Sequence, residues 1–291
     1  MVPWWAKLSA KLVLSRLPVS YGSWIKLKAF RHGQMNDPTY ASRVLRHHLD
    51  EAFGAGTDAP AGLCLEIGPG DSLFTGLSAA AAGFDGSVFV DAGDWAERNF
   101  ENLRKAAHVA GLDPARISRW ESFDAALDDV NARYLTNGLD ALRSLPDNSI
   151  SFIFSQAVLE HIRKHEYSAF IAETQRVLIP GGRCSHRVDL QDHLSRGLNN
   201  LRFSEEIWES HFFSSSGFYT NRLSYAEHRQ VFENAGYSIR NLKTDRFDKA
   251  PIEARKLAKP FRDRSLEERL VKGFDIVAEK PHDSNIKLGT G

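Results

Sequence analysis

The sequence predicts an α/β fold with a doubly wound, mainly parallel seven-stranded sheet and a closing antiparallel strand. From residue 63 to residue 189, apolar runs of strand length alternate with segments of helical periodicity. Such alternation is typical of parallel strands with helices on both faces of the sheet. The last two strands break the pattern, because a segment rich in both charge signs separates them. In a sheet of this kind, ligands bind over the carboxyl ends of the strands.

The chain begins with a predicted amphipathic helix. Four apolar residues share a helical face of about 100° and three basic residues flank it: Trp4, Trp5, Leu8 and Leu12, with Lys7, Lys11 and Arg16. This face suits a helix that packs its tryptophans on the domain, or one that lies on an anionic membrane. A peripheral membrane contact through residues 1–31 is therefore an open alternative.

A second helix is predicted over residues 38–53, followed by a glycine-containing linker. The strands then read LCLEIG, SVFVDAG, ARYLTNG, SISFIFSQAV and GRCSHRVDL. The helices between them read LFTGLSAAAAGF, WAERNFENLRKAAHVAGL, LDALRSL and HEYSAFIAETQRVLI. A further helix and strand, SYAEHRQVFENAGYSI, and a closing strand, LVKGFDIVAEK, complete the sheet.

These elements divide the chain into three predicted parts. They are an N-terminal helical extension over residues 1–54, a main α/β domain over residues 55–280 and a flexible tail over residues 281–291. Two insertions interrupt the main domain. Residues 191–224 follow the fifth strand on the side where a substrate should bind, and residues 241–269 form a charged insertion.

The composition argues against several classes of function. The chain has 37 basic and 37 acidic residues, so no overall field would attract nucleic acid, and no such partner is predicted. Cys64 and Cys184 both fall in predicted strands, as expected of a reduced, cytoplasmic protein. No uncharged apolar run reaches the roughly 18 residues of a membrane span. The predicted location is the cytoplasm, with peripheral attachment at the inner membrane face as the alternative.

The segment LEIGPGDSL carries the first predicted binding site. Gly68 and Gly70 follow the first strand and allow a tight turn and close approach of a ligand to the backbone. A dinucleotide site would have a third glycine where this chain has Leu73, and Glu66 would lie near its phosphates. The segment therefore favours a ligand with an ammonium or sulfonium group. Asp91, at the end of the second strand, can accept hydrogen bonds from both ribose hydroxyls, or cap a helix.

Four motifs in this order, LEIGPGDSL, FVDAG, LPDNSISFIFSQAVLEHI and ETQRVLIPGG, resemble those of class I S-adenosylmethionine-dependent methyltransferases. The resemblance covers about residues 60–190, particularly to the bacterial enzymes of small molecules and glycans. It implies a Rossmann-like fold and S-adenosylmethionine as the cofactor. The implied cofactor-binding residues are Glu66, Gly68, Pro69 and Gly70 around the methionine and ribose, Asp91 on the ribose, Asn137, Gly138 and Leu139 at the adenine, and Ser155 and Gln156 beside the sulfonium.

The catalytic candidates lie beyond the fourth and fifth strands. His161, in LEH, is a candidate base, although this tripeptide often has an architectural role in the family. Asp189 and His193, in SHRVDLQDHL, are candidates to touch the substrate; the competing interpretation is that Asp192 caps a helix and His193 is merely exposed. Some relatives bind a metal through E-x-x-E-H, but Ala157 occupies the first position here, so no metal is expected.

Residues 191–224 combine polar side chains with aromatic rings, which suits a sugar or another polyhydroxylated acceptor. A structural cover with an aromatic core is the alternative. The substrate-binding candidates are Asn199, Asn200, Arg202, Tyr219 and Arg222. Relatives with tails like VDLQDHLSRGLNNLRF look like enzymes of surface-polysaccharide pathways. The predicted activity is O-methylation of a sugar or glycan intermediate; a quinone, lipid or soluble metabolite as acceptor, and a non-catalytic cofactor-binding scaffold, are the alternatives.

Overall fold

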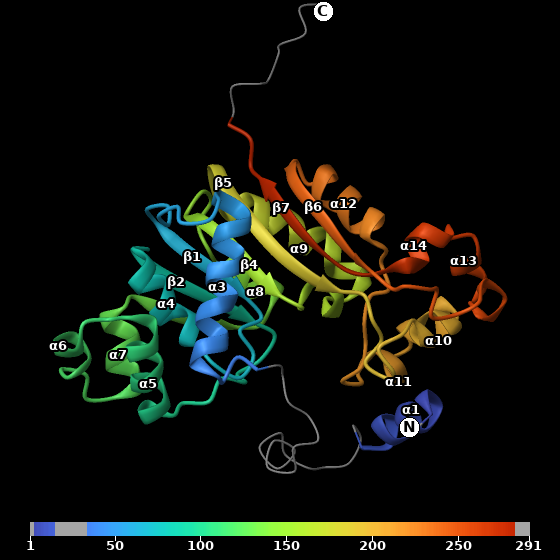
Figure 1. Ribbon diagram of the computed structural model, residues 1–291, viewed down its shortest axis with the longest axis horizontal. Coiled ribbons are helices and arrows are strands. Elements are labelled where there is room, and N and C mark those ends of the chain that lie inside the picture. Colours follow the sequence, from blue (N-terminus) through green and yellow to red (C-terminus); the bar gives the residue numbers. More distant parts are fainter. Residues whose placement is uncertain (1–2, 15–33, 283–291) are drawn as a thin grey trace, which may run out of the picture.

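The computed structural model describes residues 3–14 and 34–282 and contains a seven-stranded sheet in the order β3-β2-β1-β4-β5-β7-β6 (Figure 1). Strands β1 to β5 pair in parallel, whereas β7 runs antiparallel between β5 and β6. This confirms the predicted fold class, including its closing strand. The strands are β1 (Leu63–Ile67), β2 (Gly86–Asp91), β3 (Ala132–Thr136), β4 (Ile150–Gln156), β5 (Leu178–Asp189), β6 (Ser238–Arg246) and β7 (Val271–Glu279).

Helices cover both faces of the sheet (Figure 1). One face carries α3 (Pro38–Phe53), α4 (Phe74–Ala82) and α5 (Phe100–Ala110); the other carries α8 (Leu139–Arg143), α9 (Lys164–Val177) and α12 (Tyr225–Asn234). Besides α1, described below, the other helices are short: α6 (Pro114–Ile117), α7 (Phe123–Asp129), η1 (Leu159–His161), η2 (Asn199–Arg202), α10 (Glu205–Glu209), α11 (His211–Ser214), η3 (Ala254–Lys256), α13 (Lys259–Arg262) and α14 (Leu266–Leu270).

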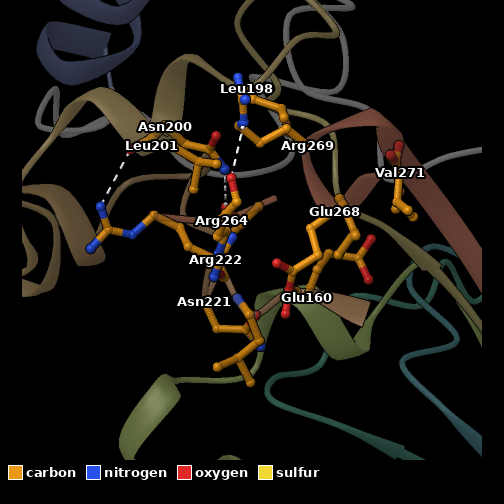
Figure 2. Close-up of a pocket in the computed structure, with 15 residues that line it drawn as sticks. Glu160, Leu198, Asn200, Leu201, Asn221, Arg222, Arg264, Glu268, Arg269 and Val271 are labelled. Atoms are coloured by element: carbon orange, nitrogen blue, oxygen red, sulfur yellow. Dashed lines mark hydrogen bonds between the residues drawn. The ribbon is translucent and has the colours of Figure 1, made fainter. Parts of the chain in front are cut away.

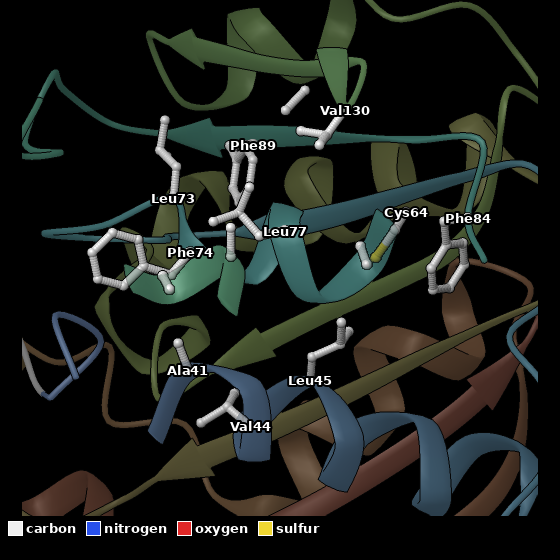
Figure 3. Close-up of a cluster of buried hydrophobic side chains, with 14 of the residues drawn as sticks. Ala41, Val44, Leu45, Cys64, Leu73, Phe74, Leu77, Phe84, Phe89 and Val130 are labelled. Atoms are coloured by element: carbon white, nitrogen blue, oxygen red, sulfur yellow. The ribbon is translucent and has the colours of Figure 1, made fainter. Parts of the chain in front are cut away.

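Two hydrophobic cores hold these layers on the sheet. In the first core, Leu45 of α3 and Leu77 of α4 pack with Phe89 of β2 (Figure 3). In the second core, Ile171 of α9 and Phe232 of α12 are fully buried against the other face. Each such side chain contributes about 1.5–3 kcal/mol when removed from water. The strand ends that carry the candidate site are therefore held by packing on both sides.

The long segment between β2 and β3 folds as α5, α6 and α7, at the lower left of Figure 1. Asp129 at the end of α7 connects the parts of this segment, because its carboxylate accepts hydrogen bonds from Arg116 and, at 2.9 Å, from Trp120 Nε1. The chain then returns to the sheet, where β3 pairs with β2 in parallel. The loop after β3 therefore still lies beside the loop after β2, although a long helical segment separates the two strands in the sequence.

Several predicted boundaries are wrong, including the following two. The helix predicted from Trp95 begins at Phe100, because the side chain of Asn99 accepts the Asn102 backbone hydrogen bond that caps it, and residues 92–99 form a loop. The charged insertion was predicted to begin at residue 241, but β6 continues to Arg246 because it pairs with β7 up to that residue. The part outside the sheet therefore begins at residue 247.

Helix α1 (Trp4–Leu14) packs against residues of the insertion 191–224. Leu8 is buried in a cluster with Trp208 and Tyr219, and the Trp4 ring meets the Phe203 ring edge-on at 6.2 Å. Trp5, in contrast, is 60% exposed. These contacts favour the helix that packs on the domain. A membrane contact through residues 1–31 stays a prediction, and much of that segment and most of the tail 281–291 lie outside the described residues.

Among the helices within residues 3–14 and 34–282, none combines the length and apolar character needed to cross a bilayer.

Candidate active site

The turn after β1 is built so that only glycine fits it. Gly68 and Gly70, on either side of Pro69, have φ of 68° and 66°, a region that residues with a Cβ rarely adopt. A Cβ on Gly68 would lie 2.6 Å from the methyl groups of Val158, which is closer than atoms can pack. The Gly68 N–H donates to the carbonyl of Val90 at 2.8 Å. The turn therefore holds bare backbone at the carboxyl ends of β1 and β2.

Asp91 is oriented by this turn. Its Oδ2 accepts the Gly70 N–H at 3.1 Å, and its Oδ1 accepts the Ala92 N–H at 2.7 Å. The Asp91 carbonyl accepts the N–H of Gly138 at 2.8 Å, so the loop after β3 lies directly against the end of β2. Each carboxylate oxygen has a second lone pair. The carboxylate can therefore accept further hydrogen bonds from a diol while its position stays fixed.

The loop after β3 also has the bare, tightly turned backbone of a ligand site. Asn137 and Gly138 have φ of 101° and 53°, and Leu139 begins α8 directly after them. The loop after β2 closes the same space, because the Glu97 N–H donates to the carbonyl of Asp71 at 2.9 Å. A turn without side chains, an oriented carboxylate and this loop fit an adenosyl ligand such as S-adenosylmethionine.

Glu66 differs from the expectation of a charged group facing the ligand. It is buried, and its Oε2 accepts a hydrogen bond from the hydroxyl of Thr75 in α4. Burial, with a smaller effect of the Asp91 carboxylate, raises the pKa of Glu66 to about 8. The side chain is therefore mainly neutral at pH 7, because the carboxylate has lost the water that would solvate its charge.

The end of β4 also differs from the expectation. Ser155 is fully buried, and its hydroxyl is 2.8 Å from Nδ1 of His186 on β5, so its side chain does not face the cofactor space. Gln156 is half-buried, and its Oε1 lies 3.1 Å from Nε2 of His48. His48 Nδ1 lies 2.9 Å from the hydroxyl of Ser185, which fixes the ring. Burial lowers the pKa of His48 to about 4, so this clamp on Gln156 is neutral at pH 7.

His161 and His193 form a stacked pair beyond the ends of β4 and β5. Their ring centroids are 4.9 Å apart and their planes differ by 18°, with the two Nε2 atoms 3.2 Å apart. His161 Nδ1 lies 2.8 Å from the carbonyl of Tyr219 and must carry the hydrogen, since a carbonyl only accepts. In the neutral pair, His161 Nε2 therefore accepts and His193 Nε2 donates. This leaves Nδ1 of His193 with a lone pair.

The pair is poised to take up a proton. Burial lowers the pKa of His193, and the nearby Lys11 of α1 lowers it further. A lowered pKa keeps the imidazole neutral at pH 7, as a general base must be. His193 is nevertheless exposed, so its ring can be reached from solvent.

The two aspartates near His193 have different positions. Asp192 is buried and caps the following loop, because Oδ1 accepts the N–H groups of Leu194 and Ser195 and Oδ2 accepts that of Asn199. The competing interpretation placed Asp192 at the start of a helix, whereas it caps a turn, and the next helix begins only at Asn199. Asp189 ends β5, where its Oδ1 accepts the Gln191 N–H at 2.9 Å.

Two of the predicted substrate-binding residues, Asn199 and Tyr219, use their polar atoms in hydrogen bonds within the protein. The Asn199 amide donates to Asp192 and Ser195 and accepts from Arg202, so all its polar capacity serves the loop. The Tyr219 hydroxyl donates to Glu209 at 2.9 Å and accepts the backbone N–H of Lys164. Both side chains therefore make hydrogen bonds within the protein, and their part in substrate binding stays a prediction.

Three other predicted residues have mixed roles. Arg202 lies over the Trp4 ring, 5.2 Å from its centroid. Arg222 is buried and pairs with Glu205 at 2.8 Å, but its Nε has no hydrogen-bond partner among the described residues. Asn200 donates to Thr220 at 3.0 Å, and its Oδ1 is likewise unpaired. Arg222 and Asn200 therefore each keep one polar atom that could meet a ligand.

Glu160 and Asn221 were not among the predicted site residues. Asn221 holds η1 in place, because its N–H donates to the Glu160 carbonyl at 2.7 Å and its Nδ2 donates to the Leu159 carbonyl at 2.8 Å. Glu160 is 2% exposed, and neither carboxyl oxygen has a hydrogen-bond partner within the described part of the chain. Two signals could have pointed to it: its sequence neighbour His161 and its place in the E-x-x-E-H pattern.

The chain was compared with known families and structures. Residues 90–185, about a third of the chain, match the family model described as "Methyltransferase domain". No curated protein matches the sequence significantly. Within residues 3–14 and 34–282, no three His, Cys, Asp or Glu side chains are grouped as in a metal site.

Several solved structures are similar to this chain at low sequence identity. A methyltransferase from Methanosarcina mazei is 16% identical, with 77% of this chain and 94% of that chain covered and a TM-score of 0.46. A putative methyltransferase of Haloferax volcanii, in complex with the activator Trm112, is 17% identical, with 86% and 92% covered and a TM-score of 0.45. The geranyl diphosphate C-methyltransferase of Streptomyces coelicolor is 12% identical, with 83% and 78% covered and a TM-score of 0.47.

These structural likenesses are distant, so the assignment depends on the family match and on the sheet. The matched segment runs from the end of β2 into β5 and includes the loop that follows β3. The turn and carboxylate described above fit the expected cofactor. The family match and these features therefore support a methyltransferase that uses S-adenosylmethionine as its cofactor.

Proposed function

We propose that this methyltransferase methylates a hydroxyl group of a sugar or glycan intermediate and that His193 receives the hydroxyl proton. The observation that carries the proposal is the stacked pair of His161 and His193 beyond the ends of β4 and β5. S-Adenosylmethionine, when bound, supplies a methyl group on a positively charged sulfur. A hydroxyl must lose its proton when its oxygen takes up that methyl group, so the site needs a neutral base.

The pair has the features of such a base. The Tyr219 carbonyl fixes the His161 ring, and His161 in turn fixes His193 through the contact of their Nε2 atoms. When Nδ1 of His193 takes up the proton, its Nε2–H becomes part of a cation and its hydrogen bond to His161 becomes stronger. A base that is oriented by a second group contributes about 100 to 10,000-fold to a rate.

The choice of a sugar or glycan is supported by the polar side chains around the pair. Glu160, Asn200 and Arg222 have buried polar atoms without partners among the described residues, as a hydroxyl-rich acceptor would require. The aromatic cluster of Trp208, Phe203 and Phe213 lies behind them and gives the insertion a rigid core.

The test is methyl transfer from isotopically labelled S-adenosylmethionine to separate acceptor pools: nucleotide sugars, lipid-linked glycans, quinols and phospholipids. We expect label on a glycan oxygen, located by mass spectrometry of the isolated product. Label only in quinols, phospholipids or a soluble metabolite would replace the sugar by that acceptor. Binding of S-adenosylhomocysteine without transfer to any pool would favour the non-catalytic scaffold.

A further inference from the structure

We propose that a polar recess beside the histidine pair binds a second, non-reacting hydroxyl group of the acceptor. The recess lies where η1 and the end of β5 meet η2, α14 and the segment from Thr220 to Ser224 (Figure 2). The proposal rests on the proposed function for the nature of the acceptor, and it concerns a different part of that molecule. Glu160, Asn200 and Arg222 provide the hydrogen-bonding groups.

Unpaired polar atoms identify the recess as a binding site. Both carboxyl oxygens of Glu160, Oδ1 of Asn200 and Nε of Arg222 are buried without a partner among the described residues. An unpaired buried polar group costs about 1–3 kcal/mol, so such groups are rare in native proteins. Here three side chains around one recess carry them. A ligand that pairs with them would recover this free energy.

The donors and acceptors match a neutral hydroxyl. Arg222 Nε can only donate and Asn200 Oδ1 can only accept, whereas a hydroxyl group does both. Burial raises the pKa of Glu160 to about 8, so at pH 7 its carboxyl group is mainly protonated and can donate as well. Asp189, Glu268, Arg264 and Arg269 also line the recess, so its lining carries both charge signs.

The size of the recess limits what it can hold. Its interior volume is about 20 Å³, which admits a group the size of one hydroxyl or water molecule and not a whole sugar ring. The arginine Arg222 cannot swing away to enlarge it, because its guanidinium group donates to the Phe203 carbonyl at 2.7 Å and pairs with Glu205. A hydroxyl or hydroxymethyl branch of a larger acceptor fits this volume.

The recess adjoins the proposed catalytic pair. Glu160 Oε1 lies 4.0 Å from Nε2 of His161, and η1 carries both residues. An acceptor with hydroxyl groups on neighbouring carbons could therefore place one in the recess and present another to His193. The recess would then select which oxygen is methylated.

The experiment measures sugar binding directly and needs no methyl transfer. The probes are the methyl glycosides of glucose, mannose, galactose and rhamnose, tested with the full chain and S-adenosylhomocysteine by saturation-transfer NMR. We expect at least one glycoside to bind the unmodified chain. Glu160→Gln keeps a donor and an acceptor and should bind within about 3-fold, whereas Glu160→Leu should bind at least about 10-fold more weakly.

A second variant and a control make the outcome decisive. Asn200→Leu removes the other acceptor and tests the recess if Glu160→Leu does not fold. Ser87→Ala, on β2, removes another buried hydroxyl without a described partner, far along the sheet from the recess, and should leave glycoside binding unchanged. Equal binding by the unmodified chain and both leucine variants, or no binding of any glycoside, would overturn the recess proposal. Failure of the proposed function would instead appear as no methyl transfer to a sugar oxygen, whatever the NMR result.

Discussion

The two halves of the strand-end surface are built in different ways. On the cofactor side, after β1, β2 and β3, the site consists of backbone: glycines with positive φ and N–H groups that orient one carboxylate, Asp91. On the acceptor side, after β4 and β5, the site consists of side chains brought together from distant segments. His161 meets the Tyr219 carbonyl, 58 residues away, and His193, 32 residues away.

This difference separates what a local motif can encode from what requires the whole fold. A turn of bare backbone depends on a few neighbouring residues, so it can be recognised in a short segment. A cluster of side chains depends on strand register and on insertions packed against each other. The cofactor side is therefore suited to one constant ligand, whereas the acceptor side can change with single substitutions.

Gly68→Ala tests the backbone-built side and should have the largest effect. An alanine at φ of 68° costs about 1–2 kcal/mol, and the overlap of its Cβ with Val158 costs about another 1–3 kcal/mol. Distortion of the turn should weaken S-adenosylhomocysteine binding by about 100-fold, as measured by calorimetry. Gly83→Ala is the matched control, since Gly83 also has positive φ but its Cβ would meet nothing within 4 Å.

A shorter side chain at position 158 separates the two causes of this effect. Gly68→Ala combined with Val158→Ala should recover part of the affinity, because the overlap is relieved while the backbone strain remains. Normal cofactor affinity in Gly68→Ala alone would show that bare backbone at this turn is not required.

His193→Ala tests the side-chain-built side. We expect turnover to fall by about 100-fold, because the base that takes up the hydroxyl proton is lost. S-Adenosylhomocysteine affinity should not change, since His193 lies beyond the ends of β4 and β5. Arg196→Ala, an exposed position in the same loop, is the control. If His193→Ala retains full turnover, the histidine pair is not the base.

Asp91→Ala returns to the cofactor side, where one side chain completes the backbone site. We expect cofactor binding to weaken by about 1–3 kcal/mol, through lost buried hydrogen bonds. Asp91→Asn keeps an acceptor for the backbone N–H groups of Gly70 and Ala92 and should lose less. An unchanged dissociation constant for Asp91→Ala would remove this residue from the site.

The smallest expected effect is a change of stability with pH, and it involves two buried glutamates. Glu66 lies on the cofactor side and Glu160 on the acceptor side. The pKa of both Glu66 and Glu160 is raised to about 8 in the folded chain, so between pH 4.5 and pH 8 the unfolded chain releases protons that the folded chain keeps. Stability should therefore fall as pH rises through this range. Between pH 6.5 and 8.5 we expect a decrease of about 2–5 °C in Tm.

The two variants should each remove about half of this decrease. The pKa of both carboxyl groups is raised to about 8, so Glu66→Gln and Glu160→Gln each abolish a similar titration. Buried histidines have a smaller, opposite effect. The pKa of His48 is lowered to about 4 and that of His186 to about 3, so near pH 6.5 the unfolded chain binds protons at these residues that the folded chain does not. A decrease in Tm that neither variant reduces would show that these two carboxyl groups do not titrate in this range.

Much of the fold and of the cofactor side could be predicted from the sequence. Hydrophobic patterns identified the seven strands, and the glycine turn and Asp91 were recognised as neighbours because parallel strands end at the same edge. The boundaries at Phe100 and Arg246 were missed, since one depends on a cap and the other on pairing with β7.

The acceptor side could not be predicted to the same extent. Ser155 was expected beside the sulfonium, but it lies opposite His186 in the register of β4 and β5, and the pattern of either strand alone does not specify that register. Asn199 and Tyr219 have the chemistry of sugar-binding residues, yet the partners that use their polar atoms include Asp192 and Glu209, in a loop and a helix of their own insertion. Residue type alone does not show which polar atoms remain available.

The placement of α1 has a consequence for the acidity of the medium in which the enzyme works. Lys11 of this helix contributes to the lowered pKa of His193, so a segment at the far end of the chain adjusts the base. Removing α1 would remove the positive charge of Lys11 and expose His193 to more water. The pKa of His193 would therefore rise. A shortened chain should accordingly reach half of its maximal rate only in a more alkaline buffer, while its sheet stays intact.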